Sequence, residues 1–184
     1  ETALVPGFSY LEYNSFEDLK SLDGSIGAVI LELVQGEGGV IPADEKWIQS
    51  LAKTCRELGI LIIVDEIQTG IGRTGTFFAF EQYGIFPDII SLAKGLGNGI
   101  PVGAILAKEK LASSFGPGSH GTTFGGNLLA MTAAEKVVET VRDIDFLEDV
   151  QKKSTHFFTA LEKLKSLDIV VDVRGKGLMI GIQV

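Results

Sequence analysis

The chain of 184 residues is long enough to bury the core of one domain, and hydrophobic residues make up 45% of it. Its net charge of -8 and its lack of clustered Lys and Arg argue against nucleic acids or acidic membrane surfaces as partners. The lone Cys55 can form neither an internal disulfide nor a cysteine metal cluster, so without a signal peptide we expect a cytoplasmic protein that holds no metal.

Two further features bear on the class of protein. Residues 111–134 carry no Asp, Glu, Lys or Arg, but their Gly, Ser, Thr and Asn content predicts a polar loop and the start of a helix instead of a membrane span. The chain does not begin with Met, and residues 178–184 resemble a strand with no closing element. We therefore expect a fragment of a longer protein that does not enter a membrane.

The first predicted elements are short and precede a clear helix. Residues 7–13 alternate in polarity, which predicts an edge strand, and residues 14–15 should cap a brief helix that ends at residue 22. Residues 44–58 predict an amphipathic helix that Gly59 terminates. Its apolar stripe consists of Ile48, Leu51, Ala52, Cys55 and Leu58.

Apolar runs on either side of this helix predict two buried strands. Residues 26–32 form the first run, and a glycine-rich bend after it carries Glu32 and Glu37. Residues 60–64 form the second run, which Asp65 follows at once. A strand, helix and strand in this order predict a crossover unit, so all three carboxylates should reach the same edge of the sheet.

A third apolar run, residues 89–92, is followed by Lys94 and by the glycine-rich residues 95–99. If this strand neighbours the one that precedes Asp65, the amine and the carboxylate face one crevice at the carboxyl edge, where open α/β sheets hold ligands. An aspartate that holds a protonated pyridine nitrogen and a lysine that forms a Schiff base are what pyridoxal phosphate chemistry requires.

The remaining elements continue the α/β pattern. We expect a loop at 68–76, a short helix at 77–83, a strand at 102–107, an irregular loop at 113–126, helices at 127–143 and 145–167, and strands at 169–173 and 178–184 split by residues 174–177. Long irregular loops are uncommon and often functional. The polar face of the last helix favours a connector into a further domain.

Other interpretations of these residues stay open. Asp65 and Glu66 could be structural acids or the metal-binding carboxylates of a nucleotide hydrolase, but residues 70–76 lack the lysine of a phosphate-binding loop. The glycines around Lys94 do not fit G-x-G-x-x-G, which weakens a dinucleotide hypothesis. His120 could be a general base, yet it has neither a nucleophilic elbow nor a ligand partner nearby, which favours a hydrogen-bonding role.

Five motifs in order resemble the class III pyridoxal-phosphate aminotransferases of fold type I, and within them the acetylornithine aminotransferase branch. They lie at 35–40 (QGEGGV), 65–75 (DEIQTGIGRTG), 87–103 (PDIISLAKGLGNGIPVG), 120–127 (HGTTFGGN) and 174–181 (RGKGLMIG). The resemblance covers essentially the whole chain. It implies a three-layer α/β fold with a mostly parallel sheet.

The resemblance also implies roles for single residues. Lys94 would form the Schiff base with pyridoxal 5'-phosphate and carry the proton, while Asp65 would pair with the pyridine nitrogen. Ile67 would pack on the ring face, and Gln68 would lie beside the phenolic oxygen. Thr123 would reach the phosphate of a neighbouring subunit's cofactor, which implies a homodimer.

The same resemblance implies roles for two glutamates and a division of the chain into two domains. Glu37 is similar to a gate glutamate that pairs with a substrate-binding arginine, and Glu32 lies with it among the substrate and gate residues. Residues 1–144 would belong to the large cofactor-binding domain. Residues 145–184 would supply a connector helix and the first strands of a small α+β C-terminal domain.

The implied partners are amino-acid and 2-oxo-acid substrates. The expected reaction transfers an amino group from N-acetylornithine to 2-oxoglutarate, giving N-acetylglutamate semialdehyde and glutamate in arginine biosynthesis. Ornithine or 4-aminobutyrate aminotransferase activity is the first alternative. An alternative of another class is a truncated, non-catalytic domain.

Overall fold

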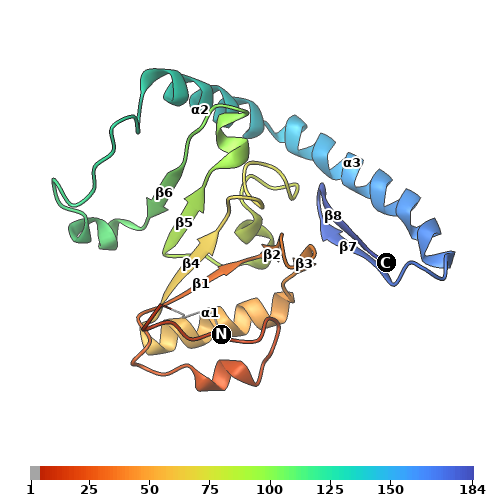
Figure 1. Ribbon diagram of the computed structural model, residues 1–184, viewed down its shortest axis with the longest axis horizontal. Helices are drawn as coiled ribbons and strands as arrows, with labels where there is room; N and C mark the ends of the chain where they lie inside the picture. Colours follow the sequence, from red (N-terminus) through yellow and green to blue (C-terminus); the bar gives the residue numbers. More distant parts are fainter. Residues whose placement is uncertain (1–4) are drawn as a thin grey trace.

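A four-stranded sheet lies at the centre of the computed structural model, which describes residues 5–184 (Figure 1). Its strands, in spatial order, are β1 (Ala28–Glu32), β4 (Leu61–Asp65), β5 (Ile89–Leu92) and β6 (Ala104–Ala107). The first three are parallel, and β6 runs antiparallel to β5. The predicted α/β fold with a mostly parallel sheet is confirmed.

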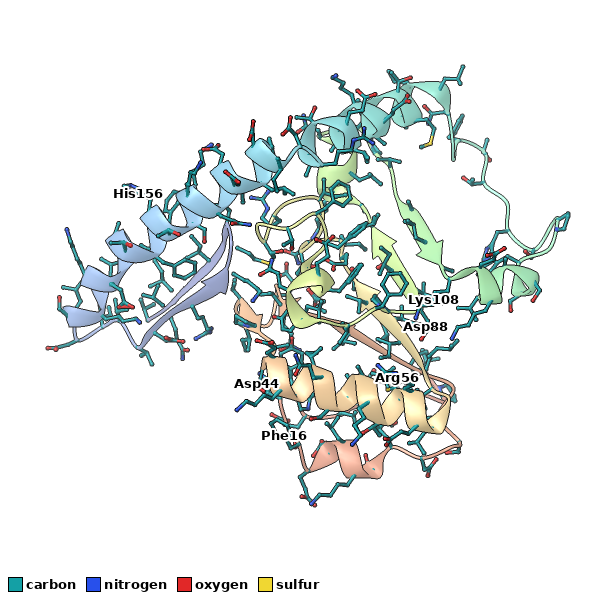
Figure 2. The ribbon with its side chains drawn as sticks, turned by 180° about the vertical axis from the view of Figure 1, so that it is seen from behind. Phe16, Asp44, Arg56, Asp88, Lys108 and His156 are labelled. Atoms are coloured by element: carbon teal, nitrogen blue, oxygen red, sulfur yellow. The ribbon has the colours of Figure 1, made fainter. Side chains whose placement is uncertain are left out.

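Helix α1 (Glu45–Leu58) packs against this sheet and forms the main core with it. Asp44 caps its first turn by accepting a hydrogen bond from the Trp47 amide at 2.8 Å, and Gly59 ends it with a left-handed φ of 73°. Asp44 and Arg56 mark the two ends of the helix in Figure 2. The core joins Trp47, Ile48, Leu51 and Cys55 to Ile62, Val64, Ile90 and Tyr83.

The other side of the sheet is less completely covered. Ile30 is 61% exposed and Ile105 is 69% exposed, although both lie in strands. Helix α2 (Leu128–Val141) packs beyond the end of β5, where Ala134 meets Leu92 and Leu96 in a second, smaller core.

The last part of the chain lies against the loop that follows β4. Helix α3 (Ile144–Leu161) continues from α2, and β7 (Asp172–Lys176) pairs with β8 (Met179–Gln183) in an antiparallel hairpin beside it (Figure 1). The amide of Leu178 donates to the Arg73 carbonyl at 2.9 Å, and the Gln151 side chain donates to the Gly75 carbonyl at 2.7 Å. The division into domains at residue 144 stays a prediction.

Short elements fill many of the connections between residues 5 and 184. They are the strands β2 (Val34–Gln35) and β3 (Ile41–Pro42) and the 3-10 helices η1 (Asp18–Ser21), η2 (Ala79–Tyr83), η3 (Lys94–Gly97), η4 (Glu109–Ser114) and η5 (Glu162–Ser166). The helices predicted at 77–83 and at the end of 145–167 take this tighter form, which is common in short runs and at helix ends. Over the same residues, no helix has the length and apolar character needed to cross a membrane.

The prediction for the first residues was wrong in two respects. Residues 7–13 form no strand, because none of the described strands pairs with them and a lone extended segment has no ladder. Asn14 does not cap a helix but adopts a φ of 64°, and its side chain accepts a hydrogen bond from the Asp44 amide at 2.8 Å. Ser15 does accept from the Asp18 amide, at 3.2 Å.

The boundary between the last two strands also differs from the prediction. Residues 174–176 belong to β7, whereas the sequence interpretation placed a break there. Gly175 lies in the ladder opposite Ile180 with a φ of 139°. An added Cβ on Gly175 would lie 2.0 Å from the Met179 carbonyl oxygen, so this glycine allows close strand pairing.

Candidate active site

Three polar residues lie in one row at the carboxyl edge of the sheet. Strand register places Glu32 beside Asp65, and Asp65 beside Ser91. The Oδ1 atom of Asp65 accepts hydrogen bonds from the Ile67 amide at 2.9 Å and from the Ser91 hydroxyl at 3.2 Å. Two donors therefore fix the orientation of the half-buried carboxylate.

Ser91 was missed by the sequence analysis. The available signal was its position as the one polar residue in the apolar run 89–92, three residues before Lys94. Period-two alternation would have placed its side chain on the same face as that of Asp65 once the strands were taken as neighbours.

A cavity of about 390 Å³ adjoins this edge, within the size range of small-molecule and cofactor sites. Four chain segments line it: the bend after β2, the loop after β4, the start of η3 and the turn into β8. Its lining residues are Gly36, Glu37, Val40, Ile67, Gln68, Gly70, Ile71, Arg73, Lys94, Gly95, Leu178, Met179 and Ile180. Four of the predicted site residues, Glu37, Ile67, Gln68 and Lys94, are thus brought together.

Lys94 is the lysine of this cavity, and its backbone is strained. It has a φ of 44°, a left-handed conformation that costs a non-glycine residue about 1–2 kcal/mol. The following residues, Leu96 and Gly97, are buried, and the Leu96 amide donates to the Ala93 carbonyl at 2.9 Å. Strain of this kind persists where the surroundings fix the backbone, and it is concentrated at functional sites.

Gly36 and Gln68 fit together on one side of the cavity. A Cβ atom on Gly36 would lie 2.3 Å from Nε2 of Gln68, so only glycine leaves room for this side chain. The Gly36 amide donates to Oε2 of Glu32 at 3.2 Å, which ties the bend to the row of polar residues. Glu32 therefore supports the bend, while the exposed Glu37 within the bend lines the cavity.

The C-terminal hairpin forms a wall that the sequence analysis did not predict. Leu178, Met179 and Ile180 line the cavity, and Arg174 in β7 donates from Nε to the Gly39 carbonyl at 3.0 Å. These contacts join residues far apart in the chain. No local pattern in residues 174–180 indicates which loop they meet.

Thr123 is not brought to this cavity. It lies exposed in the irregular segment before α2, so its role toward a neighbouring subunit stays a prediction. His120, in the same segment, is exposed and stacks on Phe115 with 5.4 Å between ring centroids. The stack on Phe115 is not a hydrogen bond, so the expected hydrogen-bonding role of His120 stays a prediction.

Glu66, next to Asp65 in sequence, is buried and takes no direct part in the cavity lining. Its carboxylate accepts hydrogen bonds from the Thr69 hydroxyl and from the Phe80 amide at 2.9 Å. Burial raises the pKa of Glu66, and its hydrogen bonds partly offset this rise. The two acids of the motif thus occupy different environments, since Asp65 lies at the sheet edge and Glu66 in the interior.

Comparison with known proteins supports an assignment to a family. The chain is 52% identical over 182 residues to the acetylornithine aminotransferase of Listeria innocua, a match that covers 98% of this chain and 47% of that protein. The chain thus spans about half the length of the curated relatives it matches.

Solved structures show the same fold. The ornithine aminotransferase of Toxoplasma gondii, described with partial occupancy of PLP at its active site, matches with a TM-score of 0.93 and 31% identity over 99% of this chain and 44% of its own. The acetylornithine aminotransferase of Elizabethkingia anophelis matches with a TM-score of 0.89 and 38% identity, covering 96% and 46%. Residues 9–184 match the family model described as aminotransferase class-III. The chain belongs to the class-III aminotransferase family.

Proposed function

We propose that the protein containing this chain is a pyridoxal-phosphate-dependent aminotransferase that uses N-acetylornithine and 2-oxoglutarate. The observation that carries the proposal is the placement of Lys94 in a cavity that Ile67 and Gln68 also line, beside the strand edge that holds Asp65. The similarity to the Listeria acetylornithine aminotransferase supports the choice of amino donor.

The residues of the cavity fit pyridoxal 5'-phosphate by their chemistry. The cavity supplies the amine of Lys94 for an aldehyde and the apolar side chain of Ile67 for a flat ring. Asp65 does not line the cavity but lies at the adjoining sheet edge, where its hydrogen-bonded carboxylate suits a pyridinium nitrogen. When bound, the cofactor supplies an aldehyde that takes up the amino group and a ring that accepts electrons.

Lys94 and Asp65 carry the proposed chemistry. The Nζ atom of Lys94 would hold the cofactor, and its amine would move a proton at the α-carbon of the substrate. Asp65 would hold a proton on the ring nitrogen, and the donors Ser91 and Ile67 keep its carboxylate oriented. The left-handed backbone at Lys94 directs this one residue out of the buried segment that follows it.

The other predicted residues orient the ligands. Ile67 would pack on the ring face, and Gln68 would lie beside the phenolic oxygen. Glu37 lies on the exposed bend and acts as the gate toward substrate carboxylates, with Glu32 fixing that bend from below. Thr123 reaches the phosphate site of a second subunit in the proposed homodimer.

Exposed apolar side chains around Thr123 support the homodimer. Phe124 is 79% exposed and Leu128 is 85% exposed, and both lie within five residues of Thr123. Apolar side chains gathered in this way mark interaction surfaces. The protein is further proposed to act in the cytoplasm, on small amino-acid and 2-oxo-acid substrates.

Ornithine aminotransferase activity is the second candidate, because the Toxoplasma ornithine aminotransferase shares the fold with a TM-score of 0.93. The two activities differ in whether the distal amine of the donor is acetylated. Turnover of N-acetylornithine, ornithine and 4-aminobutyrate with 2-oxoglutarate, compared by kcat/KM, separates them. A protein that turns over none of the three would leave only a non-catalytic role.

The test of the cofactor site is chemical. The protein is incubated with pyridoxal phosphate and reduced with borohydride, and the lysine that carries the pyridoxyl group is mapped by mass spectrometry. We expect label on Lys94 and none on this peptide in Lys94→Arg. Label spread over exposed lysines such as Lys53 and Lys152, with Lys94 unlabelled, would refute the proposal.

A further inference from the structure

Glu66 is a buried acid that the proposed chemistry does not use. Its relative exposure is 0%, although it directly follows Asp65 and directly precedes Ile67. We propose that Glu66 is a positioning residue, whose carboxylate fixes the turn that presents Ile67 and Gln68 to the cofactor. This inference rests on the proposed function, since it gives those two residues their ligand.

Both oxygens of Glu66 are held, and they join two segments. Oε2 accepts from the Thr69 hydroxyl within the turn, and Oε1 accepts from the Phe80 amide at the start of η2, at 2.9 Å. In the backbone, the Gly70 amide donates to the Glu66 carbonyl at 2.9 Å and closes the turn. The turn is therefore anchored at residues 66 and 69, on either side of the two residues that line the cavity.

A polar network continues behind this turn. The Thr74 hydroxyl donates to the Thr69 carbonyl at 3.3 Å, and the side-chain NH₂ group of Gln82 donates to the Thr74 carbonyl at 3.0 Å. The same Gln82 amide also contacts the Thr76 hydroxyl at 2.8 Å. The loop from this turn to η2 is thus held by hydrogen bonds that reach the Thr69 carbonyl, and the Thr69 hydroxyl in turn donates to Glu66.

The length and chemistry of Glu66 both matter for this role. Removing the carboxylate leaves the Phe80 amide and the Thr69 hydroxyl without their acceptor, so the two hydrogen bonds that fix the turn are lost. Glutamine keeps the reach, because its oxygen can face the amide and its NH₂ group can donate to the Thr69 hydroxyl oxygen. Glu66→Gln should therefore rescue the turn, whereas Glu66→Ala should not.

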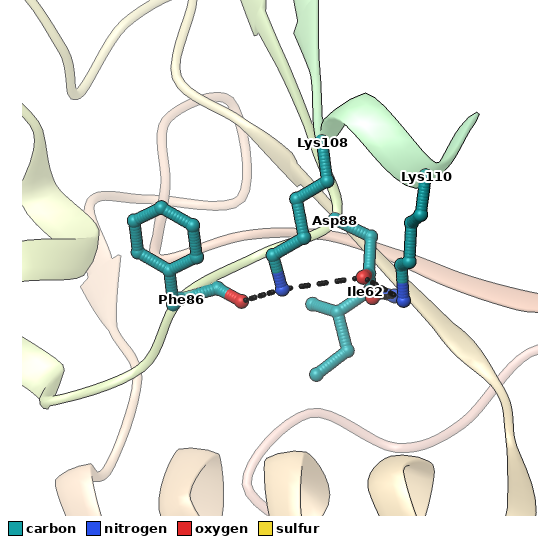
Figure 3. Close-up of polar contacts among 5 residues, drawn as sticks. All are labelled: Ile62, Phe86, Asp88, Lys108 and Lys110. Atoms are coloured by element: carbon teal, nitrogen blue, oxygen red, sulfur yellow. Dashed lines mark hydrogen bonds and ion pairs between the residues drawn. The ribbon is translucent and has the colours of Figure 1, made fainter. Parts of the chain in front are cut away.

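A matched control lies at the opposite edge of the sheet. Asp88 is also a buried acid, and Figure 3 shows it with the Ile62 amide, Lys108 and Lys110. It accepts from the Ile62 amide at 3.0 Å, and its nearest lysine amine is that of Lys110 at 2.8 Å. Asp88→Asn would weaken the fold through its ion pairs, without touching the turn that carries Ile67.

The test measures cofactor dissociation in the complete protein by absorbance titration with pyridoxal phosphate, and its stability by urea unfolding. We expect Glu66→Ala to weaken cofactor binding at least about tenfold, the ratio that corresponds to roughly 1.4 kcal/mol. Glu66→Gln should stay within about threefold of the parent. Asp88→Asn should stay within about twofold, while losing at least as much stability as Glu66→Gln.

A kinetic readout separates positioning from general stability. With saturating cofactor, Glu66→Ala should lower kcat with little change in the KM of the amino donor, because Ile67 and Gln68 contact the cofactor and not the donor. Asp88→Asn should leave both constants unchanged.

Defined results overturn the inference. Cofactor binding in Glu66→Ala within twofold of the parent would do so, and so would equal weakening in Asp88→Asn. If Glu66→Ala does not fold, the variants Thr69→Val and Thr69→Ser test the role of Glu66, because only serine keeps the hydroxyl that donates to it. Loss of cofactor affinity in the valine variant alone supports the role. Equal affinity in the two variants refutes it. Failure to label Lys94 in the unsubstituted protein would instead refute the proposed function itself.

Discussion

The strained backbone of Lys94 allows a test that does not depend on activity. Its φ of 44° costs any residue with a Cβ about 1–2 kcal/mol relative to glycine. Glycine, however, gains conformational freedom in the unfolded chain, which lowers folding stability by about 0.4–1 kcal/mol. Lys94→Gly should therefore be more stable than Lys94→Ala by about 0.5–1 kcal/mol.

The comparison is made in the cofactor-free protein by urea unfolding followed by circular dichroism. Both variants lack the amine, so any effect of its charge or of cofactor binding on folding stability is the same in the two. Lys53, exposed in the middle of α1, supplies the control pair. There Lys53→Gly should be less stable than Lys53→Ala by about 1 kcal/mol, because glycine is a poor helix former. A glycine variant at 94 that is equally or less stable than the alanine variant would refute the reasoning on strain.

Three more predictions follow from the geometry. Gly36→Ala should weaken cofactor binding in the titration, because its Cβ would displace the Gln68 side chain. Gly24→Ala is the control, because a Cβ there meets open space and should leave the affinity unchanged. Equal affinities of the two variants would contradict this account. Asp65→Ala should still be labelled by borohydride at the site lysine but should lose at least about a hundredfold in single-turnover amino transfer, and full transfer would remove Asp65 from the mechanism. The pKa of Asp88 lies below its ordinary value of 3.8, because hydrogen bonds from two lysines and a backbone amide outweigh the opposing effect of burial. Asp88 therefore stabilises the fold above about pH 3.8 and loses this effect as the pH falls through its folded pKa. Urea unfolding should show that Asp88→Asn is less stable than the parent at pH 7 but loses less folding stability between pH 7 and pH 3. Equal losses of stability in the two proteins would contradict this account.

Local sequence patterns predicted the elements that position the site. The helix at 44–58 follows from its stripe, its Asp44 cap and the glycine after it, and the structure shows all three. The neighbouring strands before Asp65 and Lys94 followed from apolar runs that end at polar residues. These features are local, so one sequence is enough to read them.

Other features depend on contacts that no local pattern encodes. Residues 7–13 have the alternation of a strand but lack a partner among the described strands. The wall formed by Leu178, Met179 and Ile180 depends on how the hairpin docks, and the burial of Glu66 depends on the amide of Phe80, fourteen residues later. Adjacent acids in a sequence give no sign of which one is buried.

The hairpin wall has a consequence for the order of assembly. The hydrogen bond from Arg174 to the Gly39 carbonyl joins residues 135 positions apart, so it closes one of the longest loops in the chain. Contacts at such separation form late, because their loop entropy must first be overcome. During synthesis, Lys94 and the loop after β4 leave the ribosome well before residues 178–180. The wall of the cavity beside Lys94 is therefore completed only after the hairpin of β7 and β8 has docked.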